Sequence, residues 1–131
     1  AVIRNPYDQM VSRYEYIRSN KNHHANKDAL RLTFGEFIEL QGSRDWNFTK
    51  TQLSKITNGK GKVIISQIYR FENYDKIMPD LCKKIDIKIP SKTTPINVSL
   101  RGRYQDYYDN KAKKFVEKCF SEDLEYFKYK F

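Results

Sequence analysis

The sequence is poor in cysteine and has no long hydrophobic run, and both absences narrow the possibilities. Its two cysteines, Cys82 and Cys119, lie far apart and outside any CxxC pair or histidine–cysteine cluster. This spacing indicates two buried thiols and argues against a zinc site or a disulfide framework. No apolar stretch approaches the roughly 18 residues that a membrane span requires. We therefore expect no membrane span in this chain.

Acidic residues are scarce relative to basic ones. The sequence has 25 Lys and Arg against 16 Asp and Glu, a formal net charge of +9. Such an excess predicts an anionic partner: nucleic acid, an acidic glycan, a phosphorylated cofactor or a membrane surface. Charge alone does not choose among them. The basic and aromatic residues are spread along the chain without a compact basic run, which makes nucleic acid the less favoured partner.

Length and aromatic content predict one folded domain over residues 1–131. A chain of this size can build one core of its own and falls short of two comfortable domains. Ten Tyr and eight Phe offset the many charges, so the composition is not that of a disordered chain. Because the pattern of an apolar strand begins at the first residue, we also expect the sequence to be a piece of a longer protein.

Local patterns predict two strands among several helices. Strands are expected at 1–4 and at 62–71, where KVIISQIYRF is so continuously apolar that both its faces should be covered. Segments 19–31 and 86–106 lack periodicity and are predicted as loops. Four helices are expected. Asn5 with Pro6 starts the first, and Thr33 with Glu36 starts the second, which ends near Gly42. Ile77, Leu81 and Ile85 form the apolar stripe of the third, and a long fourth helix begins at about Asn110. Pro79 is expected in or near the first turn of its helix. This order is typical of an α/β layer protein.

The stretch VIRNPYDQMVSRY, residues 2–14, places a fixed charge at a strand end and a hydroxyl on the following helix. Arg4 would lie beside the unsatisfied N–H groups and the positive dipole end of that helix, and Ser12 falls on the helix side away from the core. A planar guanidinium and a neutral donor suit a phosphate. The alternative is that Arg4 pairs with Asp8 and that Ser12 is solvated.

A second stretch suited to anions lies in the second long loop. Arg101 and Arg103 flank Gly102, which lets backbone N–H groups approach an oxyanion closely. The alternative is an ordinary solvated basic loop.

Several stretches together resemble a known family. They are VIRNPYDQMVSRY, TFGEFIEL, YRFENYDKIMPDLCKKIDI, INVSLRGRYQDYYD and VEKCFSEDLEYFKYKF. In this order they are similar to the carboxyl-terminal half of sulfotransferases that use 3′-phosphoadenosine 5′-phosphosulfate (PAPS), in particular the carbohydrate-modifying branch and its bacterial relatives. The resemblance covers nearly the whole chain. It implies a partial P-loop-NTPase-like α/β fold, with a few parallel strands flanked by helices and without the amino-terminal phosphate-loop unit.

The resemblance also implies a nucleotide site. Its residues would be Arg4, Ser12, Phe71, Ser99, Arg101, Gly102 and Arg103. The first two would hold the 3′-phosphate, the late-loop residues would close over it with assistance from Ser99, and Phe71 would lie against the adenine. The family's lysine-bearing 5′-phosphosulfate loop normally precedes the first strand, and nothing in this chain substitutes for it. Gln52 matches a glutamine of the family, whereas Phe48 stands where relatives carry a histidine.

The implied reaction is transfer of a sulfonate from PAPS to a hydroxyl, in this branch a carbohydrate hydroxyl, without a metal ion. The reaction needs a general base for the acceptor proton. None is assigned: His23 and His24 lie in a polar segment, and the carboxylates Glu36, Glu39 and Glu72 are no better placed, Glu72 being read as structural.

Two other functions stay open. One is a non-catalytic module that binds polyanions such as nucleic acid or acidic glycan, and the other is a remnant that binds no donor. The compartment also stays open: cytoplasm for a bacterial protein, Golgi lumen for a eukaryotic one.

Overall fold

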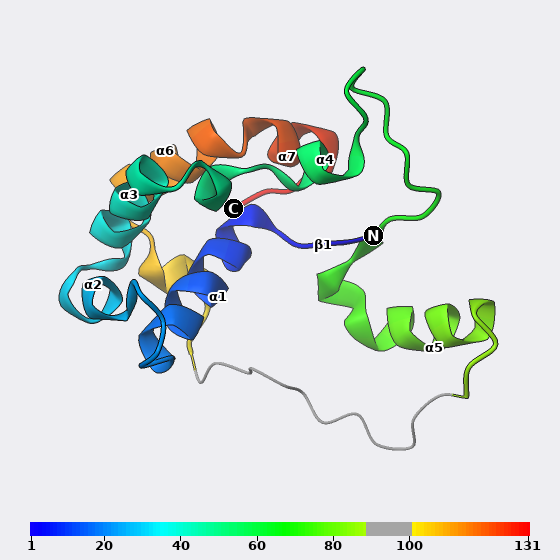
Figure 1. Ribbon diagram of the computed structural model, residues 1–131, viewed down its shortest axis with the longest axis horizontal. Helices are drawn as coiled ribbons and strands as arrows, with labels where there is room; N and C mark the ends of the chain where they lie inside the picture. Colours follow the sequence, from blue (N-terminus) through cyan, green and yellow to red (C-terminus); the bar gives the residue numbers. More distant parts are fainter. Residues whose placement is uncertain (89–100) are drawn as a thin grey trace.

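The computed structural model describes residues 1–88 and 101–131, which form helices around one small parallel sheet (Figure 1). The elements are β1 (Val2–Ile3), α1 (Pro6–Ser19), α2 (Asn26–Arg31), α3 (Phe34–Arg44), the 3₁₀ turn η1 (Trp46–Thr49), α4 (Gln52–Ile56), β2 (Tyr69–Arg70), η2 (Phe71–Asn73), α5 (Tyr74–Lys84), η3 (Tyr104–Tyr107), α6 (Asn110–Cys119) and α7 (Ser121–Tyr126). The expected strands flanked by helices are therefore present in reduced form, as a mostly helical chain with one two-stranded sheet. In the described ranges, no helix is both long and apolar enough to cross a membrane.

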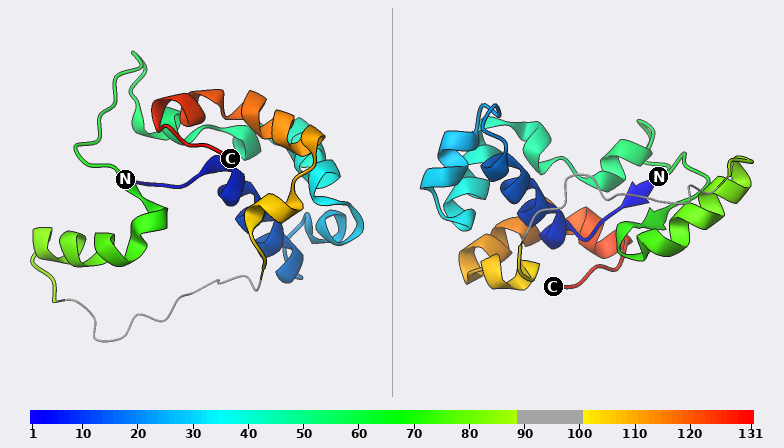
Figure 2. Two further views of the ribbon diagram at one scale, coloured as in Figure 1. Left: turned by 180° about the vertical axis from the view of Figure 1, so that it is seen from behind. Right: turned by 90° about the horizontal axis from the view of Figure 1, so that it is seen from below.

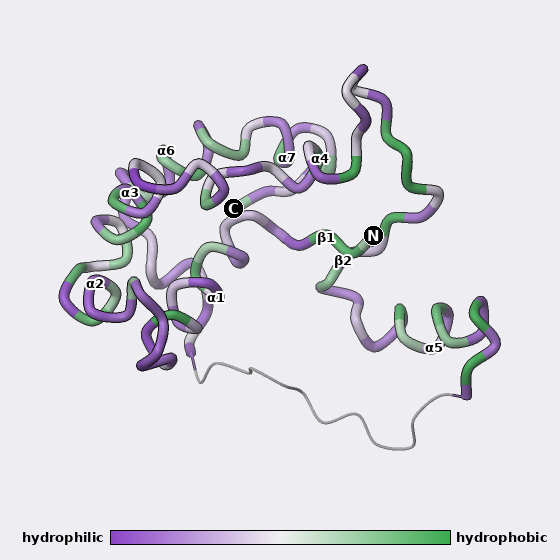
Figure 3. The backbone as a smooth tube through the Cα atoms, viewed as in Figure 1, coloured by the Kyte–Doolittle hydropathy of each residue, from purple (hydrophilic) through white to green (hydrophobic). Residues whose placement is uncertain are grey.

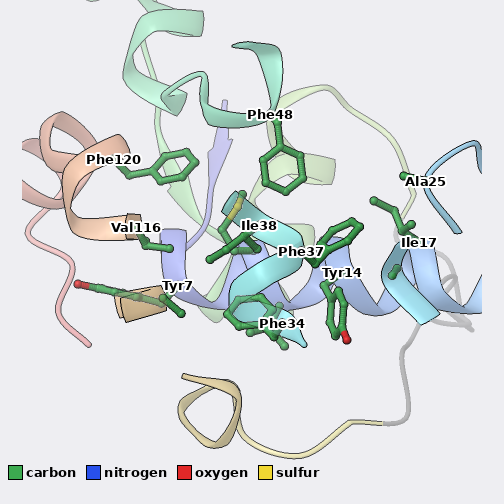
Figure 4. Packing of buried hydrophobic residues seen from close by; sticks show 14 residues of the cluster. Tyr7, Tyr14, Ile17, Ala25, Phe34, Phe37, Ile38, Phe48, Val116 and Phe120 are labelled. Carbon is green, nitrogen blue, oxygen red and sulfur yellow. The ribbon is translucent and has the colours of Figure 1, made fainter. Parts of the chain in front are cut away.

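Helix α1 begins where the sequence predicts and lies at the centre of the helical body. The Asn5 side chain accepts the Tyr7 N–H at 3.1 Å, and Pro6 takes the first helical position, where its missing N–H costs nothing. The apolar face of α1 packs against α3 and α6 to form the main core (Figure 4). Its largest fully buried side chains include Met10, Val11, Phe37, Ile38, Val116 and Phe120.

Helix α3 confirms the predicted capping box and extends past its predicted end. Thr33 accepts the Glu36 N–H, and the Glu36 carboxylate accepts the Thr33 N–H at 2.9 Å. The helix continues through Gly42 to Arg44. A Cβ at Gly42 would approach Phe115 Cζ to 2.6 Å, so the glycine serves close packing of α6 on α3. It does not terminate the helix.

The second predicted strand is wrong over most of its length. Only Tyr69–Arg70 pairs, in parallel, with β1, and an isolated antiparallel bridge joins Thr57 to Val63. Ile64 and Ile65 are 64% and 37% exposed, so both faces of 62–71 are not covered. Figure 3 shows this apolar stretch on a segment away from the helices. Apolar β-formers indicate a buried strand only where flanking layers exist, and the described residues provide none here.

Two predicted loops and one predicted helix need smaller corrections. The predicted loop 19–31 contains α2, whose Asn26 amide donates to the Ile17 and Arg18 carbonyls at the end of α1. The predicted loop 86–106 contains η3 near its end. The predicted long final helix breaks at Phe120, whose buried ring stands between α6 and α7. These features depend on tertiary contacts that local periodicity does not report.

Helix α5 stands apart from the other helices in all three views (Figures 1 and 2). Of its predicted stripe, Ile77 is buried and Ile85 is exposed at the C-cap. Pro79 lies inside the helix and not in its first turn, because α5 starts only at Tyr74 after η2. The two cysteines are free; Cys82 is buried and Cys119 half-buried.

A tyrosine cluster closes the fold near the carboxyl terminus. The ring of Tyr7 meets those of Tyr108 and Phe131 edge to face, with centroids 5.6 and 5.0 Å apart, and the Tyr108 hydroxyl donates to the Tyr7 carbonyl. Burial, followed by the nearby Glu117, raises the pKa of Tyr7 from 10.0 to about 12. Burial also raises the pKa of Tyr108 and, together with Glu72, that of Tyr129.

The raised pKa of Tyr7 predicts loss of stability in alkali. The folded chain holds the phenol proton more tightly than the unfolded chain, so this stability is fully present below pH 10.0 and is lost as the pH rises toward about 12. Circular dichroism and tyrosinate absorbance, followed together through this range, measure the loss. Tyr7→Phe keeps the ring and should reduce the pH dependence without abolishing it, because the pKa values of Tyr108 and Tyr129 are raised as well; an unchanged pH profile in this variant would contradict the prediction.

Candidate functional site

Arg4 and Ser12, predicted to act together, are in contact. Arg4 follows β1, and its Nη1 donates to Ser12 Oγ at 3.0 Å, while its Nε donates to Asp8 Oδ2 at 2.6 Å. Asp8 and Ser12 lie one turn apart on α1, within reach of the same guanidinium. Of the alternative interpretation, the Arg4–Asp8 ion pair is present, but Ser12 is bonded to Arg4 and not merely solvated. Binding of a phosphate by Arg4 and Ser12 stays a prediction.

Phe71 lies against the same guanidinium. Arg4 Cζ is 4.5 Å from the centroid of the Phe71 ring, a cation–π contact, and the ring is 42% exposed. Phe71 is the first residue of η2, directly after β2, so the pairing of β1 with β2 brings these two residues together. Within the described residues, Arg4 Nη2 donates to no protein atom, so the guanidinium keeps donors for a ligand.

A basic hollow opens beside Arg4. Its lining residues are Arg4, Gln9, Ser12, Arg13, Tyr16, Asn47 and Lys55, contributed mainly by α1, η1 and α4. Its volume is about 580 Å³, within the range of small-molecule sites. Three of these side chains are cationic and none is a carboxylate, so the electrostatic field in the basic hollow favours an anion.

Arg13 is a half-buried cation of the basic hollow. Its Nη1 donates to the Phe48 carbonyl at 3.2 Å, and its Cζ lies 4.3 Å from the Phe48 ring centroid. Burial lowers the pKa of Arg13 from its usual value, and the nearby Asp45 partly offsets this. Sequence reasoning did not select Arg13 or Lys55, because single basic residues on helices carry no motif.

The late-loop residues are divided between two environments. Arg101 is mostly buried and forms an ion pair with Asp8 through Nη2 and Oδ1. Arg103 is 81% exposed and pairs with Asp106 at 3.1 Å, so it does not join Arg4. Gly102 lines a second hollow together with Asp8 and both arginines. A Cβ at Gly102 would only meet Asp106 Oδ2 at an ordinary 3.5 Å, so nothing here requires glycine. Ser99 lies outside the described residues.

Asp8 is the common partner of the two inner arginines. It accepts from Arg4 through Oδ2 and from Arg101 through Oδ1. The group of two guanidinium ions and one carboxylate keeps an excess positive charge. Asp8 therefore holds the two cations together and at the same time repels an anion that approaches them.

The other titratable candidates already have partners. Glu72 accepts the Asn5 N–H at 2.6 Å and the Tyr129 hydroxyl at 3.0 Å, which ties the β1–α1 junction to the carboxyl-terminal tail. Glu36 belongs to the capping box of α3, and Glu39 accepts from Lys111 at 2.7 Å. None of these contacts assigns a general base.

The two histidines stack on each other. Their ring centroids are 4.4 Å apart, and His23 Nδ1 accepts the Ala25 N–H. Burial, followed by His24, lowers the pKa of His23. In the described part of the chain, no group of three or more His, Cys, Asp or Glu side chains is placed to hold a metal ion.

In comparisons with known proteins, no protein-family model, curated protein or solved structure matches this chain.

Proposed function

We propose that this chain forms the 3′-phosphate and adenosine side of the PAPS site of a sulfotransferase. The observation that carries the proposal is the contact of Arg4 with Ser12 at 3.0 Å beside the partly exposed ring of Phe71. Arg4 and Ser12 line the basic hollow, and the Phe71 ring lies against the Arg4 guanidinium, so a charged fork, a hydroxyl and an aromatic ring lie close together. Phosphate, ribose and base of a nucleotide call for these three kinds of group.

Each side chain has a separate task in this proposal. The free N–H donors of Arg4 bind phosphate oxygens, and the charge of the guanidinium strengthens those bonds. Ser12 Oγ accepts from Arg4, so its own O–H stays available to donate to the phosphate. The guanidinium covers one face of Phe71, so adenine would use the exposed part of the ring.

The proposed reaction moves the sulfonate from the 5′-phosphate of PAPS to a hydroxyl, which we take to be that of a carbohydrate. The S–O bond to the phosphate breaks, a new S–O bond to the acceptor oxygen forms, and a base takes the hydroxyl proton. The residues described here hold the departing nucleotide, adenosine 3′,5′-bisphosphate, by its 3′-phosphate.

Ligand-induced thermal stabilisation tests this function. Adenosine 3′,5′-bisphosphate should raise the melting temperature of the wild-type chain, because a ligand at 100 times its Kd stabilises the native state by about 2.7 kcal/mol. AMP has the same base and 5′-phosphate but no 3′-phosphate, so it should give a much smaller shift. No shift with the bisphosphate, or an equal shift with AMP, would show that no dedicated 3′-phosphate site exists.

The charge of the basic hollow favours one second candidate, a polyanion-binding module. Arg13 and Lys55 extend the positive surface beyond Arg4. In this case heparin or mixed-sequence nucleic acid should bind with a steep salt dependence, and Arg4→Ala should weaken binding no more than the loss of any surface lysine. If neither these polymers nor the bisphosphate bind, the chain is a remnant without donor binding.

A further inference from the structure

Asp123 is a buried carboxylate with no role in the proposed nucleotide contacts. It lies in α7 with 0% exposure, and its two oxygens accept the backbone N–H groups of Gln52 and Leu53 at 2.7 and 2.8 Å. In the described residues it forms no ion pair, so these two hydrogen bonds hold the group in place. A carboxylate from a distant segment thus fixes the first turn of α4.

The start of α4 does not by itself require the buried carboxylate of Asp123. Thr51 Oγ1 accepts the Ser54 N–H at 3.2 Å, so the short helix already has a local N-cap. Asp123 binds the two N–H groups that precede Ser54, and one of them belongs to Gln52. The carboxylate therefore determines where the Gln52 backbone lies relative to the rest of the fold.

Gln52 in turn binds the backbone of Arg4. Its side-chain Oε1 accepts the Arg4 N–H at 2.9 Å, and its Nε2 donates to the Arg4 carbonyl at 2.8 Å. The two bonds engage both the backbone N–H and the carbonyl of Arg4, so they restrict the position and the rotation of the Arg4 backbone. The Gln52 side chain is itself buried, which limits its own alternatives.

We propose that Asp123 is a positioning residue for anion binding, acting through Gln52 on the Arg4 guanidinium. The proposal rests on the proposed function, since it explains how the Arg4 side chain is held toward Ser12 and the basic hollow. A guanidinium that must meet a phosphate within a fraction of an ångström needs support of this kind from its backbone and its neighbours.

The test compares Asp123→Asn and Gln52→Met with Thr51→Ala. Asp123→Asn keeps side-chain size and removes one acceptor. Gln52→Met also keeps side-chain size, adds no charge and removes both side-chain bonds to the Arg4 backbone. Thr51→Ala removes the N-cap of the same helix and a 3.3 Å bond to Glu122, but none of the bonds that join Asp123, Gln52 and Arg4, so it is the matched control for general loss of stability. Two quantities are measured: the Kd for adenosine 3′,5′-bisphosphate, and the Arg4 Nε–H resonance in ¹H–¹⁵N spectra, which reports the bond to Asp8.

Both positioning variants should shift the Arg4 resonance and weaken bisphosphate binding by about tenfold or more, whereas Thr51→Ala should change only the melting temperature. If Asp123→Asn does not fold, Gln52→Met gives the same comparison. An Arg4 resonance and a Kd unchanged in Gln52→Met, or changed equally in Thr51→Ala, would overturn the proposal. If the wild-type chain binds no bisphosphate, the proposed function fails, and the Arg4 resonance alone still decides whether Asp123 and Gln52 position this side chain.

Discussion

Arg4→Ala is expected to abolish the stabilisation of the chain by adenosine 3′,5′-bisphosphate. The substitution removes a charged fork whose Nη1 contacts Ser12 and whose face covers Phe71, so phosphate and base both lose their neighbour. Hydrogen bonds to charged groups contribute about 1.5–3 kcal/mol each. Loss of two of them should weaken binding at least about 100-fold, which titration calorimetry and melting curves would both measure.

Two variants separate the chemistry of Arg4 from its charge. Arg44→Ala makes the same charge change on α3, at an ion pair with Asp28 of α2 in which Arg44 is exposed, and it should leave binding almost unchanged. Arg4→Lys keeps the charge without the planar fork, so its affinity should lie between those of the wild type and Arg4→Ala. If Arg44→Ala weakened binding as much as Arg4→Ala, only net charge would matter, as the polyanion function requires.

The parts of the fold that sequence reasoning predicted well are those determined locally. Asn5 with Pro6 starts α1, and Thr33 with Glu36 starts α3, because each cap is complete within a few residues. The helical spacing that leads from Met10 to Tyr14 likewise predicts the buried face of α1, since every turn of a helix repeats it.

The parts that were wrong depend on what packs from elsewhere. The apolar stretch with Ile64 and Ile65 has the residues of a buried strand but lacks covering layers. A glycine such as Gly42 is typical of a helix end. Only the close approach of Phe115 from α6 explains why α3 contains a glycine here and continues through it. Phe120 fits a continuous helical stripe and is buried as that stripe predicts, but the break of the helix at this residue becomes evident only in three dimensions.

The contacts of the candidate site also divide into those that the local sequence indicates and those that it does not. One helical turn separates Asp8 from Ser12, so the sequence indicates that Arg4 can reach either, and both contacts occur. The Arg101–Asp8 ion pair and the Gln52 contact with Arg4 join residues far apart in the chain. No local pattern encodes such pairs, so neither could be derived from the sequence.

Asp8→Asn should change stability and binding in opposite directions. Without the carboxylate, Arg4 and Arg101 lose their shared counterion. The unliganded chain should lose about 2 kcal/mol, between the values for exposed and buried ion pairs. For a chain of this size, such a loss lowers the melting temperature by several degrees, roughly 4–8 °C.

The same substitution should tighten binding of adenosine 3′,5′-bisphosphate, because the bound phosphate no longer lies beside a negative charge. Two unit charges about 4 Å apart interact by about 1 kcal/mol even in bulk water, so the affinity should rise about fivefold or more. Asp106→Asn is the matched control: it removes the same charge from the exposed ion pair of Arg103 and should alter neither quantity much. A looser bisphosphate complex in Asp8→Asn would mean that Asp8 positions the two guanidinium ions more than it repels the phosphate. An unchanged complex would contradict the prediction, because removal of a negative charge bonded directly to that guanidinium should strengthen the binding of an anion there.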